Sequence, residues 1–272
     1  MAGRVGSGSP EEPSYDELRY EVVGGVATLT IDRPAKRNAL TWELVCDLRH
    51  AVAAARSDEA VRVIVLSGAG DRAFCSGVDL SGMAAGAGAH ELHQARGELP
   101  ALFEDLWSLG KPTIARVRGF ALAGGFGLAL ACDLVIAADD AVFGAPEVDV
   151  GLWPHVITVP LTRSMPPKVA LELMLTGRRV PASEAATIGF VTRVVPVDEL
   201  DAAVADLTTA LAGRSSAVLS LGLASFHAVW DLAAADALRV LHPMLTVSAS
   251  TEDAAEGIAA FAEGRRPVWR GR

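Results

Sequence analysis

The sequence predicts an α/β fold built on a parallel sheet, followed by a C-terminal region of helices. Between residues 24 and 144, short runs of branched apolar residues alternate with segments of helical spacing, which favours parallel strands covered by helices. Beyond residue 200 the strand-like runs end and alanine-rich helical segments follow. We therefore expect a disordered tail at 1–14, a core domain at 15–200 and a helical region at 201–272.

The first strand–helix–strand unit is expected within residues 24–70. Residues 24–34, GGVATLTIDRP, alternate small or polar with branched residues and end at a proline, which is typical of a strand that runs into a turn. Residues 40–60 have helical spacing, with Thr41 as the expected N-cap. Residues 61–70, VRVIVLSGAG, form a branched run closed by glycines, as expected of a strand buried on both faces.

The same alternation continues to residue 144. The pattern predicts a helix at 93–110, a strand at 111–119, a glycine turn with a helix at 121–133, and a single strand at 134–144. From residue 166 onward the pattern is almost entirely helical.

Composition and charge exclude several classes of function. A formal net charge of −9 without a clustered basic face argues against a nucleic-acid partner. The three cysteines lack metal-ligand spacing, so we expect reduced structural cysteines and no metal site. The first 14 residues have neither the apolar segment of a secretory signal nor the composition of a transit peptide, and no stretch is long enough to span a membrane. A cytoplasmic protein without a membrane partner is expected.

The segment ALAGGFGLALACDL, residues 121–134, contains three glycines in its first seven residues. It has neither the spacing of a dinucleotide fingerprint nor the lysine of a Walker loop. Two interpretations remain: close packing of a helix on the sheet, or a helix N-terminus whose unpaired amides form an oxyanion site. A second strand-to-helix turn, in which Gly77 precedes Val78, favours the site, because two such turns can direct two amides at one oxygen.

Four segments carry a resemblance to a known family: AFCSGVDL at 73–80, the long run from 115 to 154, residues 170–196 and the tail 251–272. Together they resemble the crotonase, or enoyl-CoA hydratase/isomerase, superfamily over about residues 18–271. The resemblance implies the ClpP/crotonase-like fold, a spiral of ββα units with a helical C-terminal trimerisation region. It also implies an acyl-CoA thioester substrate, no tightly bound cofactor, and a homotrimer or homohexamer.

The resemblance also assigns roles by position. The backbone amides of Val78 and Gly124 would hold the thioester oxygen, and Glu147 would act as general acid/base. The coenzyme A approach would include Ala35, Lys36 and Arg37, and ligand binding would further involve Ser76, Val78, Asp79, Leu80, Gly124 and Gly125. From the residues alone, solvated loop charges are the preferred interpretation of Lys36 and Arg37, and a structural acid is that of Asp79. Glu147 has the alternative of a helix-capping or loop acid, but within the matched motif catalysis is favoured.

One position departs from the family pattern. Hydratases in this family hold water between two glutamates, but the earlier position is Gly127 in this chain, and only the later one, Glu147, is present. A single glutamate suits family isomerases, so double-bond isomerisation is expected more readily than hydration. His155 lies where some family members carry a second acidic group or another specificity residue. It has either a catalytic or substrate-contacting role, or it caps a turn.

Two other functions remain open. A non-catalytic acyl-CoA-binding protein could keep the thioester pocket without turnover, which the loss of a glutamate at residue 127 favours and Glu147 opposes. A CoA-thioester decarboxylase or hydrolase with His155 as a participant is the other alternative.

Overall fold

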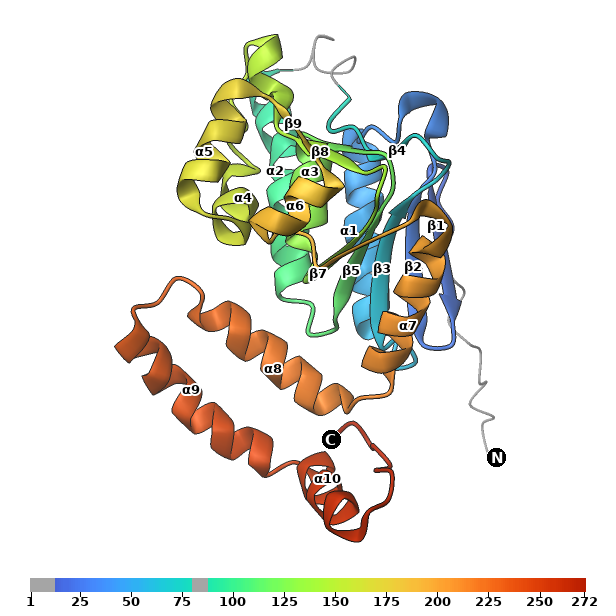
Figure 1. The fold of residues 1–272 in the computed structure, drawn as a ribbon, viewed down its shortest axis with the longest axis vertical. Coiled ribbons are helices and arrows are strands. Elements are labelled where there is room, and N and C mark those ends of the chain that lie inside the picture. The colour runs from blue at the N-terminus through green and yellow to red at the C-terminus, as the bar shows by residue number, and fades with distance from the viewer. Residues whose placement is uncertain (1–12, 80–87) are drawn as a thin grey trace, which may run out of the picture.

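In a computed structural model, which describes residues 13–79 and 88–272, the chain forms a layered α/β body from which helices extend at the C-terminal end (Figure 1). The main sheet has six strands in the order β1-β2-β3-β5-β7-β10. Their bounds are β1 Leu18–Val23, β2 Val26–Ile31, β3 Val63–Gly68, β5 Thr113–Val117, β7 Leu134–Ala138 and β10 Arg193–Val195. All neighbours in it are parallel except β1 and β2.

A smaller sheet has four strands in the order β4-β6-β8-β9, where β8 and β9 are antiparallel and the other pairs are parallel. Its bounds are β4 Ala73–Cys75, β6 Phe120–Leu122, β8 Val142–Gly144 and β9 Arg179–Pro181. Strands β3, β5 and β7 of the main sheet are each followed by one strand of the small sheet and then by helical structure. This repeat is the expected spiral of ββα units, and the fold class is confirmed.

Helices cover both faces of the main sheet. On one face α1 (Trp42–Ser57) and α2 (Ala89–Trp107) enclose the larger core together with α3 (Gly124–Ala131). Thr41 caps α1 as expected, because its hydroxyl accepts from the Leu44 N–H at 3.1 Å. On the other face Leu200 and Val204 of α7 (Leu200–Ala212) pack on strand residues that include Val63.

The remaining helices are η1 (Pro34–Lys36), η3 (Pro146–Val150), α4 (Thr158–Ser164), α5 (Pro167–Thr176), α6 (Ala182–Ile188), η4 (Val197–Glu199), α8 (Ser216–Val229), α9 (Ala234–Ala249) and α10 (Glu252–Glu263). Helices α8 and α9 lie side by side and project from the body, and α10 follows near the C-terminus (Figure 1). Many of their apolar side chains are exposed, including Phe261 at 90% and Leu245 at 69%.

The structure corrects two expectations for the strands. The single strand expected at 134–144 is two strands, β7 and β8, which lie in different sheets. Strands β9 and β10 fall within the segment that the sequence pattern predicts as helical. Both have only three residues, too few to show an alternation of apolar and polar residues.

The domain division stays a prediction. Residues 1–12 of the expected tail lie outside the described residues. Helix α7 belongs to the core by its packing, so the helices that leave the body begin at α8. Within the part of the chain that is described, no helix is long and apolar enough to cross a membrane.

Candidate active site

A cavity of about 500 Å³ opens where three neighbouring parallel strands of the small sheet end. Ser76 and Val78 follow β4, Gly124 follows β6, and Glu147 follows β8, and all four residues line this cavity. Residues that lie far apart in the sequence meet here because parallel strands present their carboxyl ends at one edge of a sheet.

The turn after β4 directs the backbone N–H of Val78 away from Leu40, the residue that pairs with this turn. Leu40 pairs with this turn as a parallel bridge: its N–H donates to the Gly77 carbonyl, and its carbonyl accepts from the Asp79 N–H, both at 2.8 Å. Val78 lies between these two bonds, so its own N–H points to the other side. That N–H has no acceptor among the described residues.

The second turn brings the amide of Gly124 beside it. Gly124 is the first residue of α3, so its N–H has no partner within the helix, and no described residue accepts from it. A Cβ added to Gly124 would lie 3.7 Å from the backbone nitrogen of Val78. Ala123, the preceding residue, has φ 50° and ψ −128°, a positive-φ conformation outside the left-handed helical region that is strained for alanine. The two turns thus place two unpaired backbone donors side by side.

Glu147 brings a carboxylate to the same cavity. It is the second residue of η3, and its Oε2 is buried without a hydrogen-bond partner among the described residues. Burial raises the pKa of Glu147, and its own backbone N–H and the charge of Arg179 oppose that rise. A carboxylate with a raised pKa and an unoccupied oxygen is suited to accept and return a proton.

His155 also lines the cavity. It is exposed, its backbone N–H donates to the Trp153 carbonyl at 2.8 Å, and its ring makes no hydrogen bond to another described residue. The turn-capping alternative therefore has no support in the contacts, and a role toward substrate stays a prediction.

Of the remaining expected ligand-binding residues, those that the structure describes do not line the cavity. Ala35, Lys36 and Arg37 are exposed in and after η1, and the Arg37 carbonyl accepts from the Ser76 N–H at 3.1 Å, so this segment borders the cavity. Asp79 pairs with Arg33 at 3.3 Å, which fits the structural alternative. Leu80 lies outside the described residues.

Gly125 and Gly127 do not line the cavity. A Cβ on Gly125 would lie 2.3 Å from the Cys75 carbonyl oxygen, and one on Gly127 would lie 2.3 Å from the Ile157 Cγ2. These two glycines therefore satisfy the close-packing interpretation of the sequence, whereas Gly124 borders the cavity. The segment 121–134 therefore contains two glycines that allow close packing and one glycine whose amide borders the cavity.

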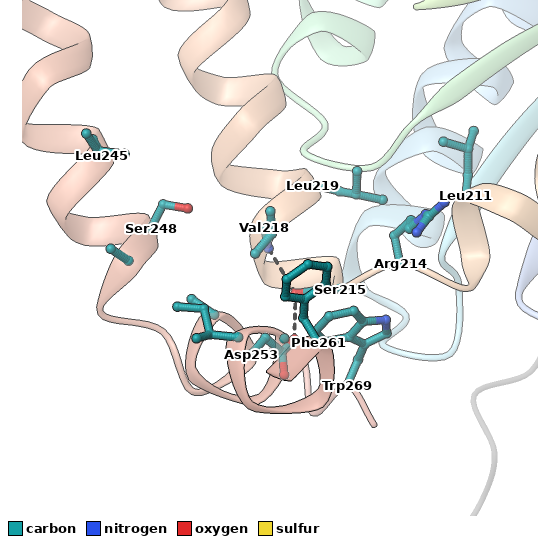
Figure 2. Close-up of a pocket in the computed structure, with 14 residues that line it drawn as sticks. Leu211, Arg214, Ser215, Val218, Leu219, Leu245, Ser248, Asp253, Phe261 and Trp269 are labelled. Atoms are coloured by element: carbon teal, nitrogen blue, oxygen red, sulfur yellow. Dashed lines mark hydrogen bonds between the residues drawn. The ribbon is translucent and has the colours of Figure 1, made fainter. Parts of the chain in front are cut away.

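A larger cavity, of about 790 Å³, lies among the C-terminal helices (Figure 2). Its lining is largely apolar, with Phe261 and Trp269 near the Ser215–Asp253 hydrogen bond of 2.5 Å. Asp253 also accepts from the N–H groups of Arg270 and Gly271, so this carboxylate holds the C-terminal segment in place. With its acid already engaged in these bonds, this cavity is a weaker candidate for catalysis.

Comparison with known proteins identifies the family. The family model described as enoyl-CoA hydratase/isomerase matches residues 21–272. The chain belongs to the enoyl-CoA hydratase/isomerase family. It is 34% identical to carnitinyl-CoA dehydratase of Proteus mirabilis over 94% of this chain and 98% of the relative. It is 36% identical to 2,3-dehydroadipyl-CoA hydratase of Escherichia coli K12 over 91% and 96%.

Structural similarity agrees with this family assignment. The crystal structure of an enoyl-CoA hydratase from Mycobacterium smegmatis superposes with a TM-score of 0.90 at 32% identity, covering 94% of this chain and 99% of that one. The expected superfamily and its acyl-CoA chemistry are confirmed. The roles of individual residues remain predictions.

Sequence reasoning missed several residues that line the cavity: Trp42, Arg96, Leu99, Ile157 and Arg179. Trp42, Arg96 and Leu99 lie on helices α1 and α2, where their spacing indicates only a helix face, and Arg179 lies on β9, which the pattern did not predict. Among residues 13–79 and 88–272, no group of three His, Cys, Asp or Glu side chains could hold a metal ion.

Proposed function

We propose that this family member is an enoyl-CoA isomerase in which Glu147 is the single acid/base and the amides of Val78 and Gly124 hold the thioester oxygen. The observation that carries the proposal is the unpartnered Oε2 of Glu147, which lines the same cavity as these two free amides. Ile157 occupies the space that a side chain at residue 127 would need, which supports a mechanism with one glutamate.

The proposed reaction begins from a 3-enoyl-CoA. The Glu147 carboxylate removes a proton from C2, and the electrons move toward the thioester oxygen, giving a dienolate. The two N–H groups donate to that oxygen, an interaction that typically lowers a barrier by about 3 kcal/mol for each donor. Glu147 then returns the proton to C4, which leaves a 2-enoyl-CoA and the original carboxylate. Because the same group gives back the proton that it takes, no second acid is required.

Hydration of a 2-enoyl-CoA is the second candidate, and it is favoured by the similarity of this chain to proteins named as hydratases and dehydratases. It needs a group that holds water beside Glu147. Asp149 and His155 line the same cavity and are the side chains available for that purpose.

One assay panel separates these functions. The wild-type protein is incubated with matched 2-enoyl-CoA and 3-enoyl-CoA substrates, and products are identified by chromatography and mass. The proposal expects conversion of the 3-enoyl thioester to outpace water addition to the 2-enoyl thioester. Faster hydration would favour the second candidate, and binding without turnover would favour an acyl-CoA-binding protein. Release of carbon dioxide or free thiol would favour the decarboxylase or hydrolase alternative.

We further propose that the coenzyme A moiety lies along Ala35, Lys36 and Arg37, and that α8–α10 mediate a homotrimer or homohexamer. The exposed cations beside Ser76 support the first point. The exposed apolar side chains of Leu245 and Phe261 support the second. Light scattering after size-exclusion chromatography measures the mass, and a monomer of 28.3 kDa would contradict the second point.

A further inference from the structure

Gly127 and Ile157 fit against each other within the core. Gly127 lies in the buried helix α3. A Cβ on it would lie 2.3 Å from Cγ2 and 2.9 Å from Cβ of Ile157, and 3.1 Å from Cζ of Phe103. Ile157 and Phe103 are each only 2% exposed. Residue 127 can therefore carry no side chain unless Ile157 moves.

Ile157 has little freedom to move. Its carbonyl accepts from the Leu161 N–H at 3.0 Å as α4 begins, and the next residue donates to the Pro154 carbonyl at 3.0 Å. A β-branched side chain has few alternative rotamers, so the backbone anchor also fixes the position of Cγ2. Displacement would require the start of α4 to shift.

Ile157 separates Gly127 from the active-site cavity. Ile157 lines the cavity that contains Glu147, whereas Gly127 and Phe103 do not. The side chain thus presents one side to Gly127 and another to the cavity, next to Val156, which also lines it. Any group that projected from residue 127 toward the cavity would have to pass through the volume that Ile157 fills.

We propose that Ile157 is a specificity-determining residue of the acyl cavity: it closes the space in front of Gly127 and restricts the acyl group there to an unbranched chain. This inference rests on the proposed function, because it assigns the cavity to the acyl part of the thioester. A packed wall discriminates by size, and a single methyl group against such a wall typically changes relative affinity by about tenfold or more.

The first experiment measures binding and needs no turnover. Dissociation constants of butanoyl-CoA, 2-methylbutanoyl-CoA and 3-methylbutanoyl-CoA are determined by calorimetry for the wild type, Ile157→Val and Ile157→Ala. Leu161→Ala is the matched control, because Leu161 is buried in α4, the helix that begins directly after Ile157, but does not line the cavity. We expect the affinity for at least one branched thioester relative to the linear one to rise about tenfold in Ile157→Ala and less in Ile157→Val. The ratio should stay within about twofold of wild type in Leu161→Ala.

The outcomes distinguish this inference from the proposed function. Binding of all three ligands with ratios that Ile157→Ala leaves unchanged would overturn this inference alone. No binding of any acyl-CoA to the wild type would overturn the proposed function, and this inference with it. If Ile157→Ala does not fold, Ile157→Val supplies the test, and an unchanged ratio in that variant overturns the inference.

A second experiment tests the coupling between the two positions. Gly127→Ala is introduced into the wild type, Ile157→Ala and Leu161→Ala, and the midpoint of urea unfolding is measured. The added methyl should lower the midpoint in the wild type and in Leu161→Ala, and have a much smaller effect in Ile157→Ala, which provides the space. In Ile157→Ala it should also reduce the gain for branched ligands. Equal losses in all three backgrounds would contradict the direct contact and overturn the inference.

Discussion

The Cβ that Gly77 lacks would lie 2.7 Å from the Cβ of Ala123, so the two strand-to-helix turns that present the amides of Val78 and Gly124 are in contact. Gly77 has φ +102° and Ala123 has φ +50°. Each turn therefore supports the unusual backbone of the other, and the distance between the two proposed oxyanion donors depends on this contact.

Gly77→Ala should damage both stability and activity, and Gly189→Ala is its matched control. Gly189 has nearly the same φ, +103°, but no atom within 4 Å of the added Cβ. Both variants strain the backbone, and only Gly77→Ala adds a clash, which we expect to cost a further ~1–3 kcal/mol of unfolding free energy. Misplaced donors should lower kcat/KM by about 10²-fold or more. Equal losses of unfolding free energy and of kcat/KM in the two variants would contradict a role for the contact between Gly77 and Ala123.

The activity should have an acidic limb that follows Glu147. Isomerisation requires the carboxylate form, and burial raises the pKa of Glu147. As pH falls, kcat/KM should therefore decline with a midpoint above the ordinary value of about 4.3 for a glutamate. A pH profile with 3-enoyl-CoA measures this midpoint. A midpoint below the ordinary value would contradict the environment described for this carboxyl group.

The raised pKa of Glu147 should also make the free energy of unfolding depend on pH. Between the pKa of Glu147 in the unfolded chain and its higher value in the folded protein, the folded state holds the proton more tightly, so stability falls as pH rises through that window. Glu147→Gln lacks this proton equilibrium. Its stability relative to wild type should therefore increase as pH rises, then level off. Urea unfolding at fixed protein concentration tests this, and a relative loss for the variant with rising pH would have the wrong sign.

Lys36 should matter only for the nucleotide part of the ligand. Lys36→Ala should raise KM for an acyl-CoA about fivefold at low salt, the effect of roughly 1 kcal/mol from an exposed charge, and added salt should reduce the difference. With the matching acyl-pantetheine, which lacks the nucleotide phosphates, KM should not change. Lys168→Ala, at another exposed lysine, is the control. Equal changes in KM for the acyl-CoA and the acyl-pantetheine would contradict an interaction of Lys36 with the nucleotide phosphates.

Much of the site could be predicted from the sequence because its parts are local. Glycines placed between a strand and a helix predict the turns at Gly77 and Gly124. A motif of the family predicts Glu147. The division of residues 134–144 into two strands was missed, because Asp139 and Asp140 interrupt an apolar run without a glycine or proline. Ile157 could not be recognised either, since its contact with Gly127 joins positions 30 residues apart through the packing of α4 on α3.

The most direct test of the central claim is proton transfer by Glu147 itself. A 3-enoyl-CoA is incubated in D₂O with wild type or Glu147→Gln, and NMR follows both the shift of the double bond and deuterium entry at C2 and C4. Calorimetry with a saturated acyl-CoA checks that the variant still binds. The account predicts rapid isomerisation by the wild type, with deuterium entering at C4 only to the extent that the Glu147 proton exchanges with solvent before its return. It also predicts a loss of at least about 100-fold in the isomerisation rate of Glu147→Gln, with binding retained. Isomerisation by Glu147→Gln at the wild-type rate would contradict it.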